Sequence, residues 1–183
     1  DNDRLLRNDG GRFTDVTAEM GLPKESGLGL SVLVSDLNMD GWPDIYVAND
    51  YSQYDYIYIN QQGKGFRDEG RKRLGHSSHY SMGSDAADIN NDGLPDLFTL
   101  DMLQEDPARY KNEVYMVNFD YYARLKGANF HDQQIRNCLQ LNRGDGTFAE
   151  IGTLAGVSAT YWSWSALLAD FDKRLRARCT GTV

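Results

Sequence analysis

The chain has 183 residues, and its 27 Asp and Glu against 19 Lys and Arg give a formal net charge of −8. This acidic composition argues against nucleic-acid binding, which depends on basic surfaces that displace counterions from phosphates. No run of about 18 apolar residues occurs, so the sequence predicts no membrane-spanning helix. No signal peptide is visible, and we expect any export signal to lie upstream of this segment.

Three short stretches of alternating apolar side chains recur along the chain, at residues 3–8, 55–60 and 137–142. Each ends in Asn and is followed by a Gly-containing turn and a Phe. Alternation with a period of two is typical of β-strands. β-Branched and aromatic residues predict further strands at 30–35, 45–48, 97–100 and 164–169. The sequence therefore predicts an all-β fold.

A nine-residue motif, D-x-N-x-D-G-x-P-D, occurs at residues 36–44 and again at 88–96. Three carboxylates in such a short loop repel one another unless a cation lies among them. Calcium accepts six to eight oxygen ligands, whereas zinc prefers the His and Cys side chains that both loops lack. We therefore predict two calcium sites. Their predicted side-chain ligands are Asp36, Asn38, Asp40 and Asp44, and Asp88, Asn90, Asp92 and Asp96; the carbonyls of Trp42 and Leu94 complete them.

Two other interpretations of these loops fit the sequence less well. An EF-hand opens with the same residues but places a bidentate Glu at position twelve, where this chain has Val47 and Thr99. The flanking sequences are also strand-like rather than helical. The second alternative is a pair of solvated Asp-Gly hairpin turns, but a turn does not require a carboxylate at every second position.

Strands and loops repeat with a period of about 52 residues, and an insertion of about 30 residues lengthens the following interval. This spacing places a third, incomplete calcium loop at Asp170 and Asp172. The sequence after that point, which contains Lys173, departs from the motif, so we expect an aberrant or truncated tail. The predicted division is into repeats at about 1–50, 51–100 and 135–172, an insertion at 101–134 and a tail at 173–183.

The insertion is predicted to contain a helix. Asp106 and Pro107 are typical of a helix start, and Gly127 is typical of its end. Apolar residues recur between them at helical spacing. The aromatic stripe either covers a sheet or presents a ligand surface; the aromatic residues concerned are Tyr110, Tyr115, Phe119, Tyr121 and Tyr122.

The motif, the period and the segments Asp44–Asp50 and Gly10–Gly21 together resemble the FG-GAP/VCBS repeats of integrin-α-like β-propellers. They are most similar to the bacterial repeat proteins that carry an ASPIC/UnbV domain. The resemblance implies a structural calcium on the rim of each blade, an extracytoplasmic location and a parent protein of about seven blades. The chain would then be a propeller segment of about three blades, joined by further blades of a longer chain.

The sequence offers little evidence of catalysis. The pair His76 and His79 has no third partner at a suggestive spacing, and no nucleophile-elbow, phosphate-loop or dinucleotide motif occurs. We predict a non-enzymatic segment that binds calcium and acts in ligand binding or adhesion, with a protein or carbohydrate ligand. The alternatives are a propeller enzyme with its site in the central channel and a structural scaffold of a larger surface protein. The two cysteines, Cys138 and Cys179, are not expected to form a disulfide.

Overall fold

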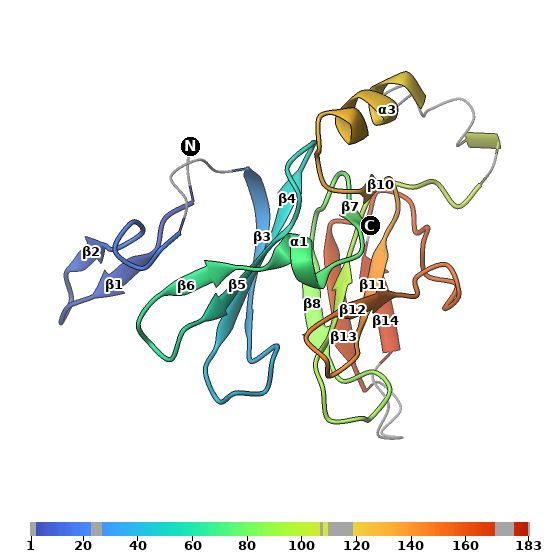
Figure 1. Cartoon of the computed structure of the whole chain (residues 1–183). Helices are drawn as coiled ribbons and strands as arrows, with labels where there is room; N and C mark the ends of the chain where they lie inside the picture. The colour runs from blue at the N-terminus through green and yellow to red at the C-terminus, as the bar shows by residue number, and fades with distance from the viewer. Residues whose placement is uncertain (1–2, 23–26, 107, 110–118, 171–177, 183) are drawn as a thin grey trace.

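The computed structural model describes residues 3–22, 27–106, 108–109, 119–170 and 178–182 (Figure 1). Two four-stranded antiparallel sheets form its centre. The first contains β3 (Leu28–Ser35), β4 (Asp44–Asp50), β5 (Tyr56–Asn60) and β6 (Phe66–Asp68), in that order. The second contains β8 (Ser84–Ala87), β9 (Asp96–Thr99), β11 (Cys138–Asn142) and β12 (Phe148–Glu150), in the same relative order.

Shorter elements flank these sheets. β1 (Leu6–Asn8) pairs with β2 (Phe13–Asp15), and β13 (Ser165–Ala169) pairs with β14 (Arg178–Thr182). β7 (Ser77–Ser78) and β10 (Gln133–Gln134) form a short parallel pair. The described helices are α1 (Gly70–Arg73) and α3 (Phe119–Gly127). The predicted all-β fold is therefore confirmed, and each predicted strand overlaps an observed one.

The first strands of successive sheets lie side by side, as expected of a radial β architecture. β8 contacts both β3 and β13. The Ser31 and Ser84 hydroxyls lie 2.9 Å apart across the first contact, and the backbone N–H of Leu168 donates to Asp85 Oδ2 at 2.7 Å across the second. The chain is thus a β-propeller segment whose sheets pack face to face.

Apolar side chains fill the spaces between neighbouring sheets. Tyr46 and Ile57 of the first sheet pack with Leu97 of the second, and all three are almost fully buried. Phe98 and Leu139 point to the opposite side and pack with Leu168 of β13. Because β-strand side chains alternate between faces, sandwiched strands need apolar residues at consecutive positions, as in Leu97 and Phe98.

The insertion emerges within the second sheet, between β9 and β11. The sheets are thus offset from the repeats defined by sequence, and the boundary predicted near residue 50 falls between β4 and β5 of one sheet. α3 ends at Gly127, as predicted, whereas Pro107 and residues 110–118 lie outside the described part. No side chain of α3 is buried, and Phe119 is 81% exposed. Phe119 is thus open to solvent, whereas the Tyr121 ring contacts the buried His79 ring, so both interpretations of the aromatic residues stay predictions.

Candidate calcium loops

The two repeated loops occupy equivalent positions in the two central sheets. Residues 36–44 join β3 to β4, and residues 88–96 join β8 to β9. Both project from the same end of the sheets, at the bottom of Figure 1. The prediction that each motif lies between two paired antiparallel strands is confirmed.

The first loop is organised by the carboxylate of Asp36. Its Oδ1 accepts a hydrogen bond from the Asp40 N–H at 3.0 Å, and its Oδ2 accepts one from the Gly41 N–H at 2.8 Å. Asp40 Oδ1 in turn accepts from the Trp42 N–H at 2.9 Å. Met39 and Gly41 have φ angles of 58° and 88°, so the sharp turn passes through the left-handed region, where Gly is least strained.

The second loop repeats this arrangement at every corresponding position. Asp88 accepts from the N–H groups of Asp92 and Gly93 at 3.1 and 2.8 Å, and Asp92 accepts from the Leu94 N–H at 2.9 Å. Asn90 Nδ2 donates to Asp92 Oδ2 at 2.8 Å, as Asn38 does to Asp40 at 3.0 Å. The shared sequence therefore produces one conformation in two places.

The last aspartate of each motif is buried. Asp44 is fully buried and accepts hydrogen bonds from the N–H groups of Leu37 and Asn60 at 2.9 and 2.8 Å. Asp96 is equally buried and accepts from Ile89 and Asn142 at 3.0 and 2.8 Å. Burial raises the pKa of both carboxyl groups, against the opposing effect of these hydrogen bonds. Both aspartates thus fasten the loop to the third strand of its sheet, and their metal ligation stays a prediction.

The donor chemistry of the loops fits a hard cation. Every predicted ligand is oxygen, and Asp40 and Asp92 are exposed to an approaching ion. Among the described residues, no Lys, Arg or His nitrogen lies within 4.0 Å of the six loop carboxylates. The negative charge of each loop therefore has no partner within the described chain. In the third motif, Asp170 is exposed and Asp172 lies outside the described residues.

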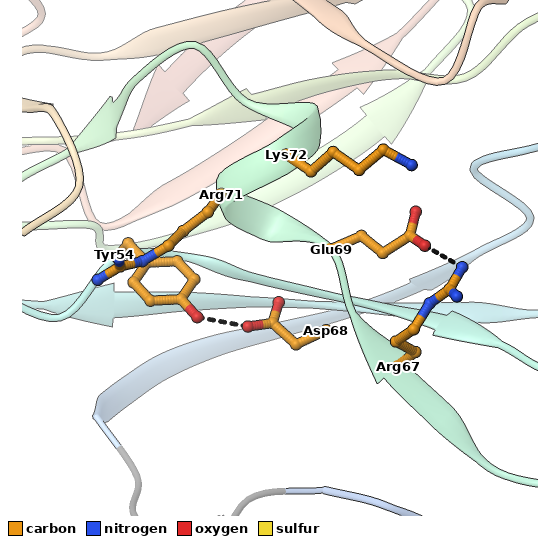
Figure 2. Close-up of a pocket in the computed structure, with 6 residues that line it drawn as sticks. All are labelled: Tyr54, Arg67, Asp68, Glu69, Arg71 and Lys72. Atoms are coloured by element: carbon orange, nitrogen blue, oxygen red, sulfur yellow. Dashed lines mark hydrogen bonds and ion pairs between the residues drawn. The ribbon is translucent and has the colours of Figure 1, made fainter.

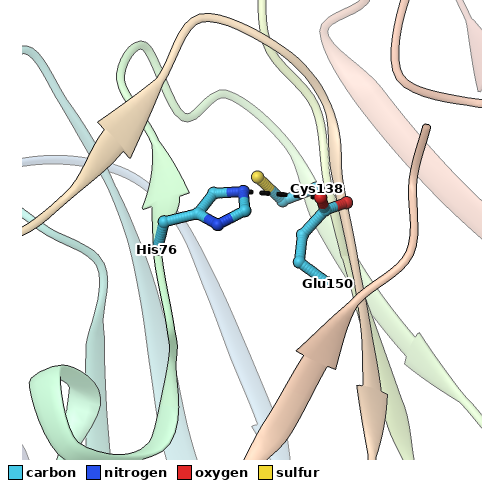
Figure 3. Close-up of side chains that lie close together, drawn as sticks. All are labelled: His76, Cys138 and Glu150. Atoms are coloured by element: carbon cyan, nitrogen blue, oxygen red, sulfur yellow. Dashed lines mark ion pairs between the residues drawn. The ribbon is translucent and has the colours of Figure 1, made fainter.

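A different cluster, which sequence spacing did not indicate, is formed by the residue before β7 and by residues of β11 and β12 (Figure 3). His76, Cys138 and Glu150 bring their ligand atoms within 4.8 Å of one another, the one such group of three found in the described part of the chain. His76 Nε2 and Glu150 Oε2 are 3.4 Å apart. Cys138 and Glu150 lie on the paired strands β11 and β12, and His76 comes from a distant part of the sequence, so no local motif could have revealed the cluster.

Arg136 already supplies a cation to this cluster. Its Nη2 lies 3.1 Å from His76 Nε2 and 3.0 Å from Glu150 Oε2. Burial alone would raise the pKa of Glu150, but hydrogen bonds and the Arg136 charge hold that pKa below its ordinary value. Burial raises the pKa of the Cys138 thiol well above its usual range, which disfavours the thiolate that a metal requires. The cluster is therefore a charge-balanced contact within the fold.

Replacing Arg136 with Met is expected to destabilise the chain by about 2 kcal/mol, because the partly buried Glu150 would lose its charged donor. Urea unfolding at neutral pH measures this effect. The matched control is Arg143→Met, since Arg143 lies 3.9 Å from Asp145 and is mostly exposed; it should change stability by less than about 0.5 kcal/mol. Equal stability of the two variants would contradict this account of the cluster.

The loops and their strands match a described protein family. Residues 36–99 match the model of the FG-GAP-like repeat. This region resembles an FG-GAP-like repeat. The FG-GAP-like region is also similar to integrin α chains: integrin alpha-6 of Gallus gallus is 41% identical over 85 residues, and integrin alpha-7 of Homo sapiens is 39% identical over 83 residues. Each match covers 39% of this chain but only 8% and 7% of the respective integrin chain.

Proposed function

We infer that this chain is a calcium-binding, extracytoplasmic β-propeller segment that acts in ligand binding or adhesion. One observation carries the proposal: two loops with the same hydrogen bonds each present uncompensated carboxylates at the same end of the fold. Similarity to integrin α chains supports the location and the role in binding. The more specific likeness to ASPIC/UnbV repeat proteins stays a prediction.

A calcium titration tests the metal sites. Each loop occupied at about 100 times its dissociation constant should add about 2.7 kcal/mol to the free energy of unfolding. Asp40→Ala and Asp92→Ala should each remove one such contribution, and the double variant should unfold identically in calcium and in excess chelator. Denaturant unfolding at fixed calcium concentrations measures these differences. If the parent chain unfolds cooperatively and its free energy of unfolding is the same in calcium and in chelator, the loops are simple turns and not metal sites.

Further blades of the same propeller are part of the proposal. The apolar side chains of β3 that point away from its sheet's core are 50–67% exposed, and they are Leu28, Leu30, Val32 and Val34. On the same face, Val47 and Tyr56 are buried beneath Leu22, so the part of the face that stays uncovered is the edge formed by β3. Another blade of a longer parent chain would cover this exposed edge, as β8 covers the opposite side of β3.

The alternative of a propeller enzyme draws on the approach of His76 to Glu150, which would suit acid–base chemistry. Arg136 already donates to both groups. His79 lies apart, buried against the rings of Tyr80 and Tyr121. The structure thus offers more support for binding than for catalysis.

No described helix is long and apolar enough to span a membrane.

A further inference from the structure

A basic groove runs between the first sheet, the insertion and the turn that joins β11 to β12. It consists of two adjoining hollows of about 360 and 630 Å³, which share Arg71 and Lys72. Lys126 comes from the end of α3, and Arg143 comes from the β11–β12 turn. Cations from three separate segments therefore gather in one place, although the whole chain has a net charge of −8.

The walls of the groove are held by specific contacts. Arg73 is buried, donates to Glu69 at 2.8 Å and donates to the Gly146 carbonyl at 3.1 Å, which ties α1 to the β11–β12 turn. Arg71 lies over the Tyr54 ring at 4.8 Å and donates to the Asn129 carbonyl at 3.3 Å. These contacts link the insertion and both sheets, so the groove is part of the folded framework.

Some of its positive charges are unpaired. Lys126 is neutralised by Asp132 at 3.0 Å, and Arg73 by Glu69. No described carboxylate lies within 4.0 Å of Arg71 or Lys72, and both side chains are exposed. In Figure 2, Glu69 pairs with Arg67, and Lys72 extends to the same side of α1 as Glu69. The charge of Lys72 helps to lower the pKa of Glu69, after the larger effects of burial and of Arg73 and Arg67, so Lys72 is partly compensated without forming an ion pair. The adjacent like charges of Arg71 and Lys72 still favour an anion.

Aromatic rings border these cations. Tyr54 forms the floor beneath Arg71, and Phe130 is 40% exposed at the wall contributed by the insertion. Aromatic rings beside charged side chains can contact the apolar faces of sugar rings while the cations bind acidic substituents. The centre of a typical protein–protein interface is instead depleted in charged residues. The groove thus suits an acidic sugar chain better than a protein surface.

We propose that this basic groove binds the carboxylate or sulfate groups of an acidic polysaccharide. The inference rests on the proposed role in ligand binding and specifies the class of ligand. Lys72 and Arg143 contact the anionic groups, and Arg71 fixes the shape of the groove through Tyr54 and Asn129.

The test compares two double variants of the whole 183-residue chain in calcium-containing buffer. Lys72→Gln/Arg143→Gln removes two exposed groove cations, and Arg12→Gln/Lys64→Gln removes two exposed cations from the turns after β1 and β5. Both variants lose two positive charges, so a difference between their affinities shows that the location of the charges matters. Binding of short oligouronates and sulfated oligosaccharides is measured by calorimetry at several salt concentrations, with neutral dextran oligosaccharides as the negative control.

The groove variant should bind both acidic probes about tenfold more weakly than the parent, with a salt dependence shallower by roughly two counterions. The control variant should bind within about twofold of the parent. Equal affinities of the two variants, or no binding of the acidic probes by the parent, would overturn the proposal. Equally tight binding of polyglutamate or an oligonucleotide would overturn the ligand class. Thermal unfolding with and without calcium is independent of these results and tests the calcium loops separately.

Discussion

Replacing Asp55 with Asn is expected to remove much of the loss of stability that the chain undergoes between about pH 4 and pH 7. Asp55 is almost fully buried at the start of β5. Burial raises its pKa from 3.8 to about 7, with a smaller contribution from the charge of Asp101 and against opposing hydrogen bonds. At pH 8 the variant should be up to about 4 kcal/mol more stable than the parent.

The sign follows from proton binding. Between the two pKa values the folded chain holds a proton on Asp55 and the unfolded chain does not. Raising the pH through this window therefore favours the unfolded state. The stabilising effect of the protonated group is fully present below about pH 4 and is lost as the pH approaches 7. Burial also raises the pKa of Asp101, so the variant should retain a residual slope of the same sign.

The second sheet indicates that Asn is tolerated at this position. Asn137 is the counterpart of Asp55, and its Oδ1 accepts from the Asp101 N–H at 2.7 Å. Asp55 Oδ1 accepts in the same way from the Asn49 N–H at 2.9 Å. An Asn at position 55 would keep this bond without a buried charge.

Urea unfolding from pH 4 to pH 8 measures the effect. Asp120→Asn, at an exposed position on α3, is the control and should leave the pH profile unchanged. A profile for Asp55→Asn that parallels the parent would show that Asp55 is not the buried group that titrates in this range.

Replacing Asp96 with Ala is expected to destabilise the chain by about 4 kcal/mol even in excess chelator. The change leaves the partly buried N–H group of Ile89 and the buried N–H group of Asn142 without an acceptor, at about 1–3 kcal/mol each, in addition to lost packing. Asn142 also donates to the Leu37 carbonyl at 2.9 Å, which connects the second sheet to the first loop. The substitution should therefore also weaken the contact between the two sheets.

Asp92→Ala is the matched control for this prediction, because Asp92 belongs to the same loop but is exposed. In chelator it should cost less than about 1 kcal/mol. In calcium both variants should lose the response of the second loop. Equal costs in chelator would mean that Asp96 does not anchor the loop in the way its hydrogen bonds indicate.

The sequence by itself determined the local elements. The strands around both motifs, the two loop conformations and the helix end at Gly127 follow from residue spacing and from the backbone freedom of Gly, which act over a few neighbouring residues. The FG-GAP-like character of residues 36–99 was visible for the same reason, because the D-x-N-x-D-G-x-P-D motif is contiguous.

Only the tertiary structure decided which loop carboxylates are exposed and which are buried. Asp40 and Asp44 are both aspartates of the same motif, yet Asp44 is buried and holds the loop to the sheet, because its carboxylate accepts a hydrogen bond from the Asn60 N–H at the end of β5. The burial of Asp55, the cluster around Arg136 and the basic groove likewise depend on segments that are distant in sequence. Their positions are set by sheet pairing and by packing between sheets, and no local pattern encodes which long-range partners will meet.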